Sequence, residues 1–303
     1  MIVRKFELTS LDVDKFKEDG YLVLRNFFSE RTIEHFQRLA EENIQRPETN
    51  YGSGFSKLNY DIGNNDEQIF DLIQNSHFKD TLYKLTNREL IFTQGLAFEL
   101  EKNKSSGFPW HVGTQSFGFH QKDDFACTIW IPFCEINANE QRGGMAYVSK
   151  KHMSGEFVYQ YINLIPDHLK KKKESEDINF EYFSRTKNNI LNLPEISGVL
   201  THYASEDHFS IKDAIIFDKY VIHRSVKLEE GSIDKRVAFA LRFADVESKY
   251  DSFRANQLEY PKHAFNYEGS SDFNTIVCKE DGQPIIDSHL FKDNLQKRIV
   301  RGN

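Results

Sequence analysis

Two of the eleven histidines stand in contexts that favour metal binding. His111 follows a turn-like segment at residues 107–110 and precedes an apolar segment that begins at Phe125. His223 comes shortly after an apolar segment that ends at Phe217. Neutral imidazoles are frequent ligands of transition metals. The sequence therefore suggests a metal centre shared by His111 and His223.

An arginine thirteen residues after His223 begins another predicted strand. Because side chains alternate between the two faces of a strand, every second residue from Arg236 to Arg242 shares one face. The two residues between these arginines on that face are alanines, which leave room for a pocket with a cation at its floor. A guanidinium binds a carboxylate through two parallel hydrogen bonds. An edge strand with its arginines in water is the alternative that this pattern leaves open.

The predicted elements that position these residues change from mainly helices to strands near residue 90. Residues 10–45 predict a helix, a short strand and a helix, and residues 66–86 predict a further helix. The 26 Phe and 13 Tyr favour a sheet-rich core. Many short strands after a helical start predict a mainly β, α+β fold with flanking helices, either a sandwich or a jelly roll. The predicted strands lie at residues 91–100, 125–133, 144–148, 213–217 and 236–243.

The domain organisation follows from this pattern. We expect a single domain over residues 1–303, with a helical N-terminal part at 10–88 and a jelly-roll core at about 90–245. A long insertion at 160–200 interrupts the strands and contains four consecutive lysines at 170–173. Such an insertion is either a lid over the site or a solvated surface loop. Residues 245–303 form a C-terminal extension that we expect to pack outside the core.

Composition and charge exclude several classes of protein. The net charge of −7 and the pI of about 5.9 argue against a general nucleic-acid binder. Cys127, Cys134 and Cys278 form no CxxC pair, which argues against a disulfide framework and a thiolate zinc site. No apolar run is long enough to span a membrane, and the N-terminus lacks a signal-peptide pattern. We therefore expect a cytoplasmic protein.

Five parts of the sequence, in order, resemble the phytanoyl-CoA dioxygenase-like branch of the iron- and 2-oxoglutarate-dependent oxygenases. The resemblance covers roughly residues 12–245. Its parts are an opening helix and strand at 15–29; the lead into a metal histidine at 109–111; two strands and a turn at 128–132 and 143–152; a strand and a second histidine at 212–217 and 223–225; and Arg236.

This resemblance implies a double-stranded β-helix, also called a jelly roll or cupin-like fold. It further implies Fe(II) held by His111 and His223, with O2 and 2-oxoglutarate as co-substrates. Arg236 occupies the position of the family's arginine that anchors the far carboxylate of 2-oxoglutarate. Thr128 and Trp130 are expected close to that site. The resemblance also implies a substrate that is either a small molecule or an acyl group on a carrier protein. Because an acidic surface does not favour docking on an acidic carrier protein, we expect a free small-molecule substrate.

The chain departs from the family at the carboxylate ligand. The family's motif is His-any-Asp or His-any-Glu, whereas this chain reads His111-Val112-Gly113. Glycine has no side chain that could bind iron, so one coordination position is left to another ligand. In the related halogenases Ala or Gly stands here, a chloride ion binds iron in the gap, and chlorine is transferred to the substrate in place of hydroxyl. This single position is similar to those enzymes, and it makes a radical halogenase our first hypothesis.

Other interpretations remain open from the sequence. His120 could be the true ligand, or a carboxylate could come from Glu99, Asp123 or Asp124. Water could fill the position in a hydroxylase of a small metabolite, or the glycine could leave an inactive site. A non-catalytic jelly-roll binding module is a further class. Arg224 and Arg242, or the lysines at 170–173, could bind an anionic group of the substrate.

Overall fold

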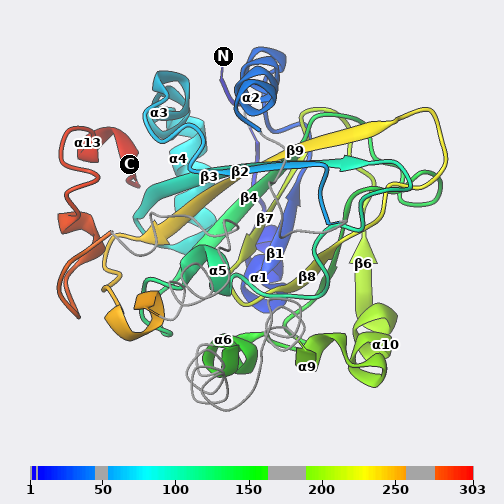
Figure 1. Cartoon of the computed structure of the whole chain (residues 1–303). Helices are drawn as coiled ribbons and strands as arrows, with labels where there is room; N and C mark the ends of the chain where they lie inside the picture. Colours follow the sequence, from blue (N-terminus) through cyan, green and yellow to red (C-terminus); the bar gives the residue numbers. More distant parts are fainter. Residues whose placement is uncertain (1, 5, 45–53, 163–188, 257–276, 303) are drawn as a thin grey trace.

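The computed structural model describes residues 2–4, 6–44, 54–162, 189–256 and 277–302 (Figure 1). Its helical start agrees with the prediction: α1 (Ser10–Asp19), β1 (Tyr21–Leu24) and α2 (Glu30–Asn43) follow one another. Thr9 and Asp12 form a capping box at the start of α1, and the Ser29 side chain caps α2. Each cap satisfies backbone N–H groups that a helix start leaves without partners.

The single helix predicted at residues 66–86 is instead two helices, α3 (Glu67–Gln74) and α4 (Ser76–Thr86). Asn75 separates them with an extended backbone, and its side chain accepts a hydrogen bond from Phe78 N. An asparagine in this position starts a new helix rather than continuing the old one. The apolar periodicity on both sides of Asn75 did not reveal this break.

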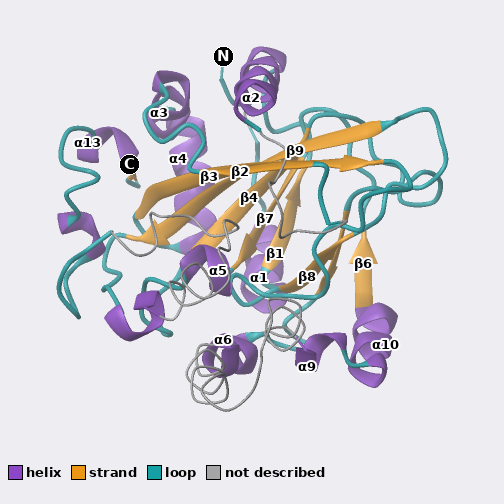
Figure 2. Cartoon of the chain, in the orientation of Figure 1, coloured by secondary structure: helices purple, strands orange, loops and turns teal. Residues whose placement is uncertain are grey.

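A large antiparallel sheet forms the centre of the described structure, with the strand order β1-β7-β4-β9-β3-β10 and with β2 paired to β3 (Figure 2). The five strands predicted after residue 90 are all present. Strand β9 pairs over long stretches with β3 on one side and with β4 on the other. The bounds in this sheet are β2 (Lys57–Tyr60), β3 (Leu90–Glu101), β4 (Ala126–Pro132), β7 (Ala214–Asp218), β9 (Lys235–Asp245) and β10 (Ile299–Val300).

A smaller sheet lies against the inner face of the large one. It has the order β6-β5-β8, formed by β5 (Met145–Val148), β6 (Ala204–Glu206) and β8 (Ile222–Ser225). The two antiparallel sheets, with helices on the outside, make a jelly roll, which confirms the predicted fold class.

Side-chain alternation divides the large sheet into two faces. Ile129 of β4 and Phe239 of β9 belong to the apolar core beneath α1 to α4. Trp130 and Ala240, one position along each strand, belong to the core between the two sheets. Figure 1 shows α2, α3 and α4 together on the outer side of the large sheet. The second face of β4 and β9 therefore lines the space between the two sheets.

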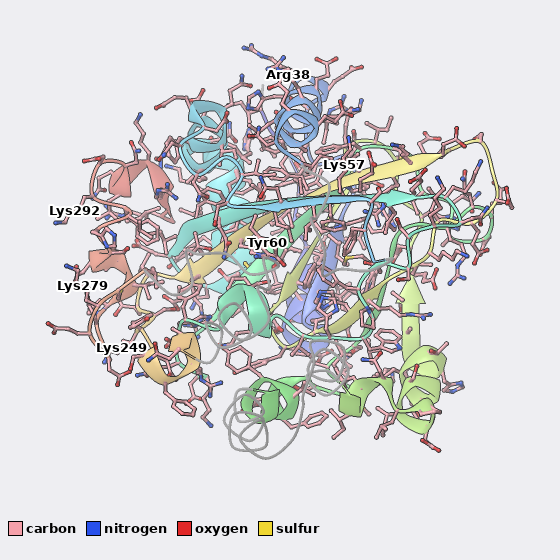
Figure 3. The ribbon with its side chains drawn as sticks, viewed as in Figure 1. Arg38, Lys57, Tyr60, Lys249, Lys279 and Lys292 are labelled. Atoms are coloured by element: carbon pink, nitrogen blue, oxygen red, sulfur yellow. The ribbon has the colours of Figure 1, made fainter. Side chains whose placement is uncertain are left out.

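Strand β9 is central in this sheet, because it pairs with β3 on one side and β4 on the other. The alternative of an edge strand with its arginines in water is therefore wrong. Arg236 is 1% exposed and Arg242 is 5% exposed. Arginines and lysines on the outer surface, such as Arg38 and Lys292, point into solvent instead (Figure 3).

Part of the predicted insertion and of the C-terminal extension lies outside the described residues. From residue 189 the insertion is helical, with α9 (Asn189–Asn192) and α10 (Pro194–Tyr203), where the sequence showed little periodicity. The described C-terminal residues add a strand to the large sheet, and Val300 joins the apolar core on its outer face. They contain η1 (Ile285–Asp287) and α13 (Leu295–Arg298), and their β10 pairs with β3. None of the described helices is long and apolar enough to cross a membrane.

Candidate active site

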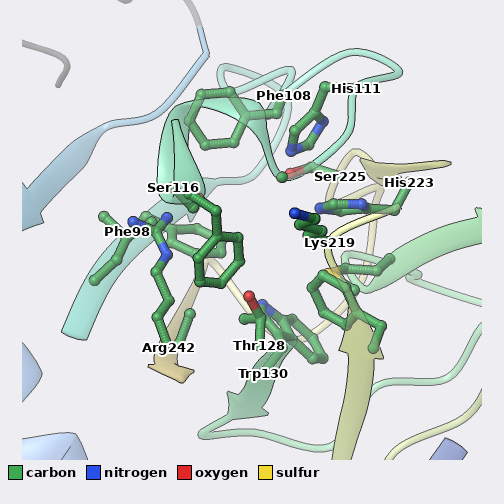
Figure 4. A pocket seen from close by; sticks show the side chains of 16 residues that line it. Phe98, Phe108, His111, Ser116, Thr128, Trp130, Lys219, His223, Ser225 and Arg242 are labelled. Atoms are coloured by element: carbon green, nitrogen blue, oxygen red, sulfur yellow. The ribbon is translucent and has the colours of Figure 1, made fainter. Parts of the chain in front are cut away.

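The backbones of His111 and His223 are hydrogen-bonded to each other in both directions. His111 N donates to His223 O at 2.9 Å, and His223 N donates to His111 O at 3.0 Å. His111 lies on the long connection between β3 and β4, and His223 lies in β8. This pairing places the two ring centroids 4.2 Å apart, and Figure 4 shows both rings at one side of a pocket. The structure thus brings together the two histidines that the sequence singled out.

Each imidazole is oriented in the same way by a carbonyl two residues earlier. His111 Nδ1 lies 2.7 Å from Pro109 O, and His223 Nδ1 lies 2.8 Å from Val221 O. Because a carbonyl only accepts hydrogen bonds, Nδ1 of each ring carries the proton, and Nε2 keeps the lone pair that binds a metal. Burial, together with the nearby His111 and Arg242, holds the pKa of His223 well below its usual value. His223 is therefore neutral, as a metal ligand must be.

Gly113 lies beside the histidines at the start of α5 (Thr114–Phe117). Its N–H donates to Lys219 O at 3.0 Å. None of the described residues that line the pocket is an Asp or a Glu. Nor do the described parts of the chain contain a group of three or more His, Cys, Asp or Glu side chains that could hold a metal. The side chains available to a metal here are therefore the two imidazoles.

The alternative ligands considered from the sequence lie elsewhere. His120 is fully buried between Phe117 and Phe119, outside the pocket lining, and burial lowers its pKa to about 3. Asp124 is 3.7 Å from His120, Asp123 is 80% exposed, and Glu99 contacts Ser56 and Lys235. The interpretation of His120 as a ligand is therefore wrong, and none of the three carboxylates reaches the histidine pair.

The glycine at 113 also has a packing reason. A Cβ added there would lie 3.0 Å from Phe117 Cδ2, 3.1 Å from Lys219 O and 3.2 Å from Lys219 Cα. Two of these atoms belong to the backbone and cannot rotate away. A side chain at residue 113 therefore requires Phe117 or the Lys219 backbone to shift by a few tenths of an ångström.

We expect Gly113→Ala to lower the free energy of unfolding by about 1–3 kcal/mol, because overpacking displaces the neighbouring backbone. Gly198→Ala is the matched control, since a Cβ at Gly198 in α10 meets nothing within 4 Å. The control is expected to raise the free energy of unfolding by about 0.5–1 kcal/mol, because alanine favours helix. Urea denaturation measures both variants. Equal stabilities would show that residue 113 is not tightly packed.

The pocket beside the histidines is mostly apolar with a few polar side chains (Figure 4). Thr128 and Trp130 line it. Three polar lining residues were not identified from the sequence: Ser116, Lys219 and Ser225. Ser225 could have been found from its place two residues after His223, which puts both side chains on the same face of β8.

Lys219 carries an unusual buried amine. The residue is 2% exposed, its Nζ donates to Gln121 O at 3.1 Å, and it lies 4.6 Å from the centre of the Tyr159 ring. Burial lowers the pKa of Lys219 to about 7. Sequence alone gave no sign of this residue, because its burial depends on Tyr159 from a distant helix, α6 (Glu156–Ile162).

Arg236 is buried behind the pocket. Its Nε donates to Gly143 O at 2.7 Å, and its guanidinium lies 5.2 Å and 5.5 Å from the ring centres of Phe98 and Trp130, which both line the pocket. Its Nη1 and Nη2, like Trp130 Nε1, have no hydrogen-bond partner among the described residues. Burial lowers the pKa of Arg236 to about 10, which leaves it charged. Three buried donors without acceptors fit the carboxylate of a ligand.

Fold and site together define a jelly-roll protein whose interior holds two converging imidazoles and a buried guanidinium. The sequence profile of the family described as Phytanoyl-CoA dioxygenase (PhyH) matches residues 16–227. The chain belongs to this family, whose members are iron- and 2-oxoglutarate-dependent oxidoreductases. No curated protein sequence matches the chain significantly.

Solved structures show the same fold at low sequence identity. The chain is similar to the α-ketoglutarate-dependent carbocyclase SnoK from nogalamycin biosynthesis, with 13% identity, a TM-score of 0.59 and coverage of 92% of this chain and 93% of SnoK. It is also similar to the epimerase SnoN, with 14% identity, a TM-score of 0.58 and coverage of 90% and 93%.

A third similar structure is EctD from S. alaskensis with 2-oxoglutarate and 5-hydroxyectoine, with 14% identity, a TM-score of 0.57 and coverage of 91% and 85%. None of these three is described as a halogenase. The likeness to halogenases therefore depends on Gly113 alone.

Proposed function

We propose that the protein uses Fe(II) and 2-oxoglutarate to halogenate an aliphatic carbon of a small molecule, with iron bound by His111 and His223. The observation that carries the proposal is the absence of any carboxylate in the described lining of a pocket that has two oriented imidazoles. When bound, iron with 2-oxoglutarate and O2 supplies the oxidising power that breaks a substrate C–H bond. A chloride ion beside Gly113 would complete the ligand set.

The residues of the chain perform defined tasks in this scheme. Pro109 O and Val221 O hold the two imidazoles in the tautomer that binds a metal. Arg236 and Trp130 provide buried donors for the far carboxylate of 2-oxoglutarate. The apolar side chains around them exclude water, which favours transfer of the halogen over side reactions.

The atoms balance for chlorination. Decarboxylation of 2-oxoglutarate gives CO2 and places one atom of O2 in succinate. The second oxygen atom leaves as water with the substrate hydrogen and one proton, and chloride replaces that hydrogen on carbon. Product and succinate are therefore expected in equal amounts.

A second candidate is hydroxylation or another oxidation without halide. The packing around Gly113 supports it, because contacts with Phe117 and Lys219 explain a glycine without any anion. Water would then take the position beside Gly113. A protein that only binds a ligand is the third class, and it requires no metal at the histidine pair.

Halide binding at the iron distinguishes the halogenase, the hydroxylase and the binding protein. Anaerobic crystals of the protein with Fe(II), 2-oxoglutarate and bromide are expected to show a bromine anomalous peak beside the iron at Gly113. Gly113→Asp is expected to lose the peak, because its carboxylate would occupy the same position, whereas Gly113→Ala is expected to keep it. Iron with only water at this position would exclude halogenation and favour the hydroxylase. The absence of both iron and 2-oxoglutarate would favour the binding protein.

A further inference from the structure

A second buried arginine lines the pocket itself. Arg242 shares the inner face of β9 with Arg236, and it is 5% exposed. Figure 4 shows its guanidinium across the pocket from the rings of His111 and His223. The two arginines lie six residues apart, which corresponds to about 20 Å along the strand. Their guanidinium groups therefore lie in two different places: that of Arg236 lies behind Phe98 and Trp130, and that of Arg242 lines the open pocket.

Arg242 and the two histidines line the same pocket. Since the described lining contains no Asp or Glu, the pocket has a positive potential. Such a potential favours an anionic ligand, and the planar guanidinium fork matches a carboxylate.

The remainder of the pocket determines what such an anion is attached to. Apolar side chains surround the space between Arg242 and the histidines: Leu96, Phe98, Phe108, Phe117, Met145 and Phe217. These side chains stabilise hydrocarbon rather than polar groups. An ion without a carbon skeleton would gain nothing from them.

We propose that Arg242 binds the carboxylate of the organic substrate, so that the substrate class is a small carboxylic acid with an apolar carbon skeleton. This inference rests on the proposed function, because it places the reacting C–H bond at the end of the substrate that lies nearest the histidines. Arg236 takes the co-substrate, and Arg242 sets the specificity for the substrate.

Hexanoate and hexanamide test this assignment, because they share a carbon chain and differ in charge. NMR of the ligand measures their binding to the protein with Fe(II) and 2-oxoglutarate under argon. Hexanoate is expected to bind at least about ten-fold more tightly than hexanamide, since hydrogen bonds to charged groups contribute about 1.5–3 kcal/mol. Paramagnetic relaxation by Fe(II) is expected to be stronger at the methyl end than beside the carboxylate.

Variants identify the arginine. Arg242→Gln is expected to remove the preference for hexanoate while retaining the binding of 2-oxoglutarate, and Arg242→Lys is expected to keep part of the preference. Arg301→Gln is the control, because the Arg301 side chain is 53% exposed and lies 3.7 Å from Glu89 at the surface. Thermal melting of every variant checks that the fold is intact.

Three results would overturn the assignment. One is equal binding of hexanoate and hexanamide to the wild-type protein. Another is loss of 2-oxoglutarate binding in Arg242→Gln, which would make Arg242 the co-substrate anchor. The third is displacement of hexanoate by millimolar chloride, which would make Arg242 part of a halide site. Repeating the titration on metal-free protein separates this inference from the proposed function, because failure of the iron site leaves the contact between Arg242 and hexanoate measurable.

Discussion

His223→Ala is expected to abolish iron binding while leaving the fold intact. Of the two imidazoles that converge, this one is buried, and its Nδ1 is already fixed by Val221 O. Changes to groups that only orient a metal ligand cost about 10- to 100-fold in affinity, so removal of the ligand itself is expected to cost more. The fold is expected to survive, because the main contribution of His223 to its β-ladder is made by backbone atoms that alanine retains.

Iron content after dialysis, and the visible charge-transfer band of anaerobic protein with 2-oxoglutarate, measure this effect. His111→Ala is expected to give the same result. His152→Ala is the control, because His152 is exposed and stacks on Tyr203 away from the pocket lining. A His223→Ala protein that keeps a full equivalent of iron and the band would show that the metal binds elsewhere.

Arg236→Met is expected to weaken 2-oxoglutarate binding without destabilising the ligand-free protein. Loss of two charge-assisted hydrogen bonds should weaken 2-oxoglutarate binding on the order of 100-fold or more, at about 1.5–3 kcal/mol each. The ligand-free protein, in contrast, is expected to be as stable as wild type or more stable by about 1–4 kcal/mol. The reason is that a buried guanidinium whose Nη1 and Nη2 have no described partner is costly, whereas methionine fills a similar volume without charge. This gain is expected to offset the loss of the single hydrogen bond from Arg236 Nε to Gly143 O.

Arg298→Met supplies the matched control, because Arg298 is also buried, at 2% exposure. Its Nη1 donates to Phe92 O at 3.3 Å and its Nη2 donates to Asn64 O, whereas neither Nη atom of Arg236 has a described partner. Loss of Arg298 leaves carbonyls without donors, so we expect destabilisation by about 1–3 kcal/mol with normal 2-oxoglutarate affinity. Melting with and without 2-oxoglutarate reports both quantities, since a ligand stabilises only the state that binds it. A melting shift that 2-oxoglutarate still produces in Arg236→Met would remove Arg236 from its proposed role.

The tight packing of Gly113 affects how these results are interpreted. Phe117 and the Lys219 backbone lie so close to residue 113 that a side chain there displaces them by a few tenths of an ångström. A carboxylate at this position, as in Gly113→Asp, therefore requires a small shift of these neighbours. The chemistry that follows from this glycine is therefore decided by the ligand beside it, which the bromide experiment measures.

The sequence by itself determined the local features of this protein. The cap at Ser29 marks a helix start, and alternation along β9 places the two arginines on one face, because these patterns depend on neighbours in the chain. The same reasoning identified His111 and His223, and the resemblance of the flanking segments predicted the jelly roll.

Only the tertiary structure decided which face of β9 is inside and which groups meet there. The burial of Arg236 depends on Gly143, Phe98 and Trp130, and the burial of Lys219 depends on Tyr159. The missed break at Asn75 has a simpler cause, since apolar periodicity does not register a single capping residue. Contacts between residues far apart in sequence are created by sheet pairing and packing, and a strand pattern specifies its two faces without specifying what covers each of them.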